Sequence, residues 1–227
     1  MSRQPAVVAF DVIETLASLE PLRGRLTDIG QPPHLLEAWY TRTLRDGMAL
    51  SAAGDYAAFA DVAEAALRAL TNYSVSDEQV AQVMAGFDDL PAFDDVLPAS
   101  TSLTEAGLRV ACLTNGSASL TSSFVDRAGL SGAVHRVISV AEVCRWKPAA
   151  VVYRYAAEVM DVPPERMALV AAHDWDCNGA KRAGLITGWV SRKSGGYGAP
   201  FAPPAVTGDD LTEVATKLLA LDADPPG

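Results

Sequence analysis

Short apolar runs separated by helix-like segments make up most of this 227-residue chain. The first, at 6–11, reads Ala6-Val7-Val8-Ala9-Phe10 and stops abruptly at Asp11. An uninterrupted run of this kind is typical of a strand that is buried on both faces of a parallel sheet. Similar runs lie at 108–113, 137–140, 167–172 and 186–190, and helices are expected at 99–106 and 149–160. The alternation predicts an α/β fold with a Rossmann-like parallel sheet.

The segment between the first two predicted strands, 17–95, follows a different pattern. Apolar residues recur at helical spacing over 35–48 and again over 56–70. Ser76, followed three residues later by Gln79, resembles a capping box at the start of a third helix. No strand-like alternation interrupts these helical patterns, so the segment is predicted to be a helical insertion.

This insertion suggests the domain organisation. We expect a core domain made of 1–16 and 96–227, with a helical cap domain of 17–95 over the carboxyl ends of the strands. In open parallel sheets those ends carry the binding site. The stretch 194–204 is rich in Gly and Pro and is expected to be a loop.

Composition narrows the range of partners. Hydrophobic residues make up 49% of the chain, and the formal net charge is −10. This charge argues against a nucleic-acid partner and, more weakly, against an anionic membrane surface. Cys112, Cys144 and Cys177 lack the spacing of a zinc site or a disulfide framework. No signal peptide or membrane-spanning run is visible, so the predicted location is the cytoplasm.

Polar residues follow four of the predicted strands. They are Asp11, Thr114, Lys147 and Asp176, and a parallel sheet brings them to one edge. A carboxylate nucleophile needs a neighbouring cation, hydroxyl or amide donors for the substrate, and a way to activate water. Taken singly, each residue also has a structural interpretation. Asp11 and Thr15 could cap a helix, Thr114 could belong to a plain turn, and Lys147 could be solvated.

Four segments of the chain resemble the motifs of the haloacid dehalogenase (HAD) superfamily, and within it the type II 2-haloacid dehalogenases. In chain order they are FDVIETL, LTNGS, RWKPAAVVY and VAAHDWDCNGA. The resemblance covers about 5–192 and supplies Asp11 as nucleophile, Thr114 where the dehalogenases usually carry Ser, then Lys147 with Tyr153, and finally Asp176. It implies the HAD core fold with a cap.

The resemblance also implies a mechanism, in which Asp11 displaces halide from C2 of a small 2-haloacid and forms an aspartyl ester. Lys147 would keep Asp11 ionised, while Thr114 and the backbone amide of Asn115 would hold the substrate carboxylate. Thr15, Tyr153 and Trp175 complete the expected substrate-binding set, although packing is an alternative role for Trp175. No cofactor is required. The expected partners are a small anionic organic substrate and, because type II dehalogenases are often dimers, a second copy of the chain.

Ile13 distinguishes this chemistry from that of the phosphatases in the superfamily. Phosphatases carry a second Asp at that position, which protonates the leaving alcohol, whereas halide leaves without a proton. The alternatives are a phosphatase that forms an aspartyl-phosphate with Mg²⁺, and a HAD-fold binding protein with little turnover. A magnesium site is not favoured, because His173 and Asp174 alter the loop that would carry its ligands.

Two positions depart from the dehalogenase pattern. The family's cap arginine, which holds the carboxylate and attracts the halide, is replaced by Tyr40. Arg42 and Arg45 follow at i+2 and i+5, which on a helix lie about 200° and 140° away, and Arg45 is the first candidate to replace it. His173 stands where the family has Asn. It could help Asp176 to position the hydrolytic water, or it could be a structural hydrogen-bonding residue.

Overall fold

The computed structural model of the protein describes residues 4–192 and 195–221. Within this part of the chain, six parallel strands form one sheet in the order β3-β2-β1-β4-β5-β6. Their bounds are β1 (Val7–Phe10), β2 (Arg109–Thr114), β3 (Val134–Ser139), β4 (Met167–Ala171), β5 (Ile186–Val190) and β6 (Val206–Gly208). Because the chain builds outward from β1 in both directions, the topological switch point lies at the carboxyl ends of β1 and β4.

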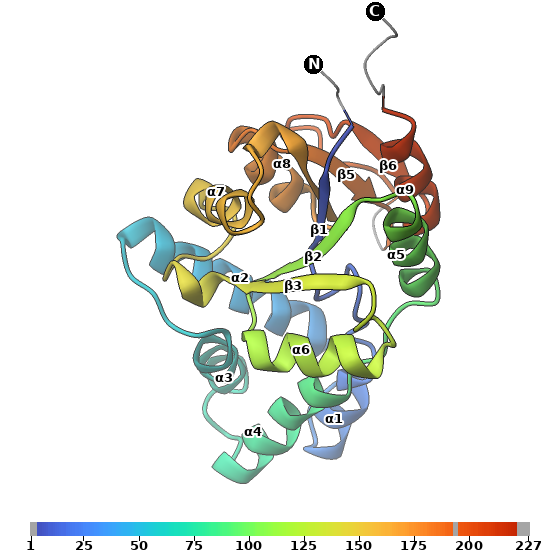
Figure 1. Ribbon diagram of the computed structural model, residues 1–227. Helices are drawn as coiled ribbons and strands as arrows, with labels where there is room; N and C mark the ends of the chain where they lie inside the picture. Colours follow the sequence, from blue (N-terminus) through green and yellow to red (C-terminus); the bar gives the residue numbers. More distant parts are fainter. Residues whose placement is uncertain (1–3, 193–194, 222–227) are drawn as a thin grey trace, which may run out of the picture.

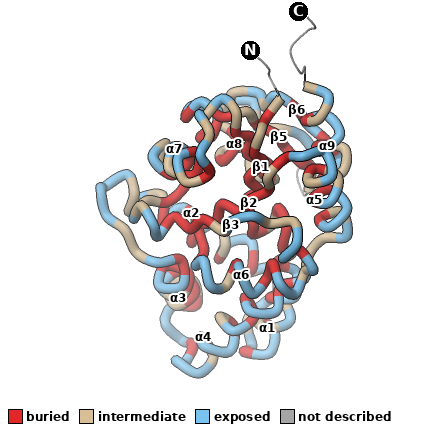
Figure 2. The backbone as a smooth tube through the Cα atoms, viewed as in Figure 1, coloured by how far each residue is buried: buried red, intermediate tan, exposed pale blue. Residues whose placement is uncertain are grey.

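Helices cover both faces of the sheet (Figure 1). One face packs against α5 (Val96–Glu105), α6 (Ala118–Arg127) and α9 (Leu211–Leu219), and the other against α7 (Ala150–Val159) and α8 (Asp174–Arg182). Side chains along β1 alternate between the two layers, with Val8 and Phe10 in one apolar cluster and Val7 and Ala9 in the other. Burial on both faces explains why β1 is apolar throughout, and Figure 2 shows the buried centre.

The segment between β1 and α5 is helical. It contains α1 (Leu22–Asp28), α2 (Leu35–Ala53), α3 (Phe59–Leu70), α4 (Asp77–Met84) and the 3₁₀ helix η1 (Ala85–Asp89). The chain enters and leaves this insertion side by side, because the amide of Ser18 donates to Pro91 O and the amide of Phe93 donates to Leu16 O. In Figure 1 the insertion lies at one end of the molecule, opposite the two chain termini.

Most predicted elements are present, with shifted ends. The strand expected at 137–140 is wrong in its bounds, because β3 starts at Val134 and Val140 belongs to the 3₁₀ helix η2 (Val140–Glu142). β3 lies at the edge of the sheet, where exposed His135 and Arg136 replace the apolar pattern of a central strand. The helix expected from residue 99 begins at Val96, since proline is tolerated in a first helical turn.

Other expectations about local structure are confirmed. Ser76 and Gln79 form the capping box of α4. The described part of the predicted loop, 195–204, contains no helix or strand, and residue 194 lies outside the described residues. β6 and α9 are not among the elements predicted from the sequence. Asp210, whose side chain accepts a hydrogen bond from the amide of Glu213, is nevertheless a recognisable helix cap. None of the helices in the described ranges is both long and apolar enough to cross a membrane.

Candidate active site

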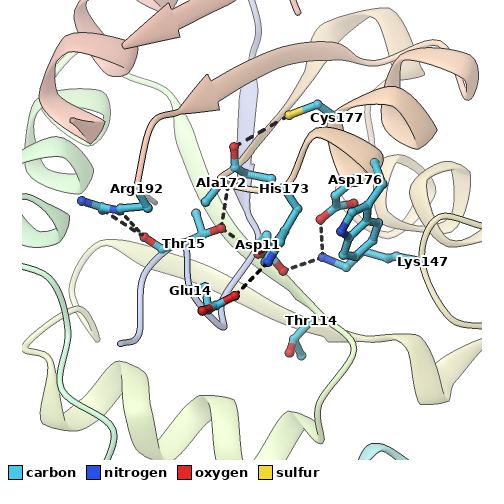
Figure 3. A network of polar contacts seen from close by, with 12 residues as sticks. Asp11, Glu14, Thr15, Thr114, Lys147, Ala172, His173, Asp176, Cys177 and Arg192 are labelled. Carbon is cyan, nitrogen blue, oxygen red and sulfur yellow. Dashed lines mark hydrogen bonds and ion pairs between the residues drawn. The ribbon is translucent and has the colours of Figure 1, made fainter. Parts of the chain in front are cut away.

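Asp11 follows β1 directly and is 6% exposed. Its Oδ1 accepts a hydrogen bond from Lys147 Nζ (2.7 Å), and its Oδ2 accepts one from Thr15 Oγ1 (2.6 Å). Nδ1 of His173 lies 3.3 Å from the same Oδ2. The amide of Ala172 donates to Thr15 Oγ1, so the Thr15 hydroxyl proton points to Asp11 rather than capping a helix (Figure 3). Oδ1, with one donor, is the less occupied oxygen.

Lys147 is fully buried, so the interpretation of a solvated lysine is wrong. Its Nζ donates to Asp11 Oδ1 and Asp176 Oδ2, both at 2.7 Å, and to the carbonyl of Leu113 at 3.0 Å. Three acceptors match the three protons of an ammonium group. The side chain of Asn115 holds this loop, because its Oδ1 accepts from the Lys147 amide at 3.0 Å.

Asp176 lies in the first turn of α8 rather than in a loop, and no part of it is exposed. Its Oδ2 binds Lys147, and its Oδ1 accepts a hydrogen bond of 2.6 Å from the hydroxyl of Tyr153. Burial raises the pKa of Asp176, and this effect prevails over the opposing charge of Lys147. Since Lys147 and Tyr153 together occupy both oxygens of Asp176, its carboxylate holds Lys147 in position.

Thr114 ends β2 and is 2% exposed. Its Oγ1 accepts from the amide of Gly116 at 2.9 Å, which leaves the hydroxyl proton to donate elsewhere. A small apolar cavity lies beside it, whose lining includes Ile13, Phe87 from the insertion and Phe124 from α6. This cavity combines an apolar wall with the Thr114 hydroxyl at its edge.

His173, at the N-cap of α8, lies between two carboxylates. Its Nδ1 is 3.3 Å from Asp11 Oδ2, and its Nε2 is 3.3 Å from Glu14 Oε2. Two aromatic rings flank the imidazole. The centroid of Trp175 lies 5.1 Å from that of His173, and the centroid of Tyr40, which projects from α2, lies 6.2 Å away. Glu14 is not among the site residues predicted from the sequence. The available signal was a second carboxylate four residues after the end of β1.

The charges in this cluster stabilise one another. Burial opposes ionisation of Asp11, but Lys147 and then His173 outweigh it and hold the pKa of that carboxyl well below its usual value. Burial lowers the pKa of His173, whereas Asp11 and Glu14 raise it, with a net result of about 9. In the same way Asp11 and Asp176 overcome burial and raise the pKa of Lys147. At pH 7 the site therefore combines an ionised Asp11 with a buried ammonium, Lys147, and a half-buried imidazolium, His173.

Not every predicted site residue joins this cluster. Tyr40 faces it, and burial followed by the charge of Asp11 raises the pKa of the phenol well above its usual value, so the hydroxyl stays protonated. Arg45 does not face it, because its side chain is 64% exposed and pairs with Asp46. Arg42 pairs with the same carboxylate at 3.5 Å. A rotation of about 140° between i and i+5 carries Arg45 to the outer face of α2.

Comparison with known proteins agrees with this geometry. The family model of haloacid dehalogenase-like hydrolases matches residues 6–184. The chain belongs to the haloacid dehalogenase-like hydrolases. Among curated relatives, an (S)-2-haloacid dehalogenase of Pseudomonas putida is 26% identical over 217 residues, which are 93% of this chain and 96% of that protein. A solved structure of an L-2-haloacid dehalogenase is 29% identical with a TM-score of 0.88, covering 95% of this chain and 98% of that one.

A second curated relative extends the comparison. Haloacetate dehalogenase H-2 of a Moraxella strain is 25% identical over 221 residues, 95% of this chain and 97% of that protein. This haloacid dehalogenase-like hydrolase is thus similar over nearly its whole length to hydrolases that are named for haloacids. Its HAD core corresponds to the six-stranded sheet described above.

The carboxylates of this HAD hydrolase do not suit a magnesium ion. Mg²⁺ requires several oxygen ligands in octahedral geometry. Here Lys147 and His173 already occupy the oxygens of Asp11, and Lys147 with Tyr153 occupies those of Asp176. Over residues 4–192 and 195–221, no group of three or more His, Cys, Asp or Glu side chains is arranged to hold a metal ion.

Proposed function

We propose that this protein is a hydrolytic dehalogenase that acts on small 2-haloacids through an aspartyl ester on Asp11. The observation that carries the proposal is the buried Asp11–Lys147 pair with Ile13, an apolar residue, two positions after the carboxylate. Ile13 cannot protonate a leaving group, and a halide leaves without a proton. The curated relatives named for haloacids support the same chemistry.

In the first step, Oδ1 of Asp11 attacks C2 of the substrate and the halide leaves with the electron pair of its bond to carbon. Oδ1 is the attacking atom because it has one hydrogen-bond donor and Oδ2 has two neighbours. Lys147 keeps the carboxylate ionised and in line. The Thr114 hydroxyl and the backbone amide of Asn115 hold the substrate carboxylate, as hydroxyl and amide donors commonly do for anions.

Residues 17–95 act as a cap in this proposal. Their contribution to the site is Tyr40, whose neutral hydroxyl approaches from α2 at the position where the dehalogenases carry an arginine. A phenol attracts a departing halide less strongly than a guanidinium does, since it carries no charge. Asp176 accepts a hydrogen bond from Lys147 and one from Tyr153, and in this way both residues hold Lys147 in position.

Halide release in the presence of EDTA, followed by a single turnover in H₂¹⁸O, tests the proposal. We expect turnover to survive chelation and ¹⁸O to enter the carboxylate of Asp11, because water attacks the ester carbonyl there. Label that appears only in the 2-hydroxy acid would show direct attack by water and exclude the ester. Activity on phosphoesters that Mg²⁺ restores after EDTA would establish the phosphatase alternative, and failure to turn over either substrate class would indicate a binding protein.

A further inference from the structure

The second half of the reaction is hydrolysis of the Asp11 ester, which requires groups that stabilise its transition state. Asp176 is fully buried and both of its oxygens are occupied, so it does not meet an incoming water. If the ester forms on Oδ1, then Oδ2 becomes the ester carbonyl oxygen. Negative charge develops on that atom when water attacks, and donors already aimed at it stabilise the transition state most effectively.

Two side chains are aimed at Oδ2. The Thr15 hydroxyl donates to it at 2.6 Å, and Nδ1 of His173 lies 3.3 Å away. The other ring nitrogen of His173 faces a carboxylate too, with Nε2 at 3.3 Å from Glu14 Oε2. A neutral imidazole would direct the lone pair of one nitrogen at one of these anions, whereas an imidazolium donates to both. The arrangement therefore selects the doubly protonated ring.

The backbone at Glu14 points to the same role. Glu14 has a φ of 66°, in the left-handed region that costs a residue with a Cβ free energy and that glycine adopts readily. Its side chain is 14% exposed and turns inward to His173 rather than out to solvent. Strain of this kind at a site is retained where the side chain has a function.

We propose that Glu14 is a positioning residue that holds His173 as an imidazolium, and that His173, together with Thr15, is a catalytic residue that stabilises the oxyanion on Oδ2 during hydrolysis of the Asp11 ester. This inference rests on the proposed function. Water adds to Cγ and the electron pair of the carbonyl moves to Oδ2. The tetrahedral centre then collapses and breaks the bond from Cγ to Oδ1. The 2-hydroxy acid leaves with one proton from water, and the second proton is released to solvent as Asp11 returns to its carboxylate.

Intact-mass analysis of the enzyme quenched during turnover of a 2-chloro acid tests this role. In Glu14→Gln and His173→Ala we expect one halide per site to be released in a burst. The ester should then accumulate and kcat should fall, by about 10² for His173→Ala and less for Glu14→Gln. Wild type should show little ester. Matched controls are Glu105→Gln and His135→Ala, both on the exposed surface, which should behave like wild type.

The pH profile separates this role from that of a general base. The charged and titratable groups that face His173 are Asp11, Glu14 and, from α2, Tyr40, with Lys147 on the far side of Asp11. Wild-type kcat should fall as pH rises and the imidazolium loses its proton, and His173→Ala should lack this alkaline limb. A kcat that rises with pH through the same range would show a neutral base and overturn the inference.

Two further outcomes are decisive. Variants that release halide and hydrolyse their ester at the wild-type rate would contradict the role of Glu14 and His173 while leaving the dehalogenase intact. If wild type and variants neither release halide nor gain the mass of the acyl group, the proposed function itself fails. The amide variant Glu14→Gln preserves the size and backbone of Glu14, and its circular dichroism should match that of wild type.

Discussion

At the residue scale, the most consequential contacts are those of Lys147, a buried lysine paired with two carboxylates. The solvated position that its sequence context allows is wrong, because Lys147 lies fully buried between Asp11 and Asp176. Removing it leaves two buried carboxylates without their counter-charge, and breaking a buried pair in this way costs about 3–5 kcal/mol. We therefore expect Lys147 to contribute to both stability and activity.

The prediction is that Lys147→Ala lowers the free energy of unfolding by about 3–5 kcal/mol and reduces halide release at least about 100-fold. Urea titration and a halide assay measure the two effects. Lys217→Ala is the control, because that lysine is 45% exposed in α9 and pairs with Glu213; its effect should stay within about 1 kcal/mol. A Lys147→Ala variant as stable as wild type would mean that the buried carboxylates take up protons at no cost.

At the element scale, α2 determines which side chain of the helical insertion lies beside His173. Its inner face carries Tyr40, and its outer face carries Arg45. We expect Tyr40→Phe to lower kcat for halide release by about tenfold, the value of one hydrogen bond to an ion. Arg45→Ala should stay within about twofold of wild type, since exposed pairs contribute little. Steady-state kinetics on one haloacid checks both, and a larger loss in Arg45→Ala would show that α2 rotates during turnover.

The same helix also supports the loop that carries Lys147. Trp146 is fully buried, and its ring lies against Gly47 of α2, where an added Cβ would come within 2.3 Å of the indole. The Trp146 amide donates to Ser51 Oγ (2.6 Å), and its indole nitrogen donates to Ala57 O (2.9 Å). The insertion and the core are therefore joined directly beside Lys147.

This contact predicts opposite effects for two glycine substitutions. Replacing a helical glycine with alanine ordinarily stabilises a protein by up to about 1 kcal/mol. Gly24→Ala in α1 should do so, because nothing lies within 4 Å of its added Cβ. Gly47→Ala should instead lower the melting temperature and reduce activity, because it displaces Trp146 and the neighbouring Lys147. Thermal melts of the two variants provide the comparison, and equal shifts would contradict the close packing at Gly47.

At the scale of the whole molecule, the His173 cluster makes stability depend on pH. The folded pKa of His173 is about 9, against 6.5 for an ordinary histidine. The stabilisation is fully present below about pH 6.5 and is lost as pH rises through about 9. We expect the unfolding free energy to fall by about 3 kcal/mol across this interval in wild type and to change much less in His173→Asn. Urea titrations at pH 6 and pH 9.5 measure the difference, and parallel losses in both proteins would contradict it.

The sequence by itself determined the features that depend on local pattern. An apolar run buried on both faces identified β1 and placed Asp11 at its end, and helical spacing identified the insertion. The residue two positions after Asp11 is Ile13, which cannot donate a proton. The sequence alone shows this, without any three-dimensional structure. These predictions succeeded because the spacing of apolar residues and the type of each residue can be read over a few neighbouring positions, and the packing of the fold agrees with them.

The family resemblance predicted that Lys147 keeps Asp11 ionised, but tertiary structure alone decided how deeply these side chains are buried and which of their atoms meet. The burial of Lys147 and its contact with Asp11 join residues 136 positions apart, and the contact of His173 with Glu14 spans 159. Whether a carboxylate at a strand end meets a cation or the solvent depends on which loops converge there, and the inner or outer placement of Tyr40 and Arg45 depends on how α2 packs. Local sequence carries none of this information, because burial and rotation are fixed by contacts between distant segments.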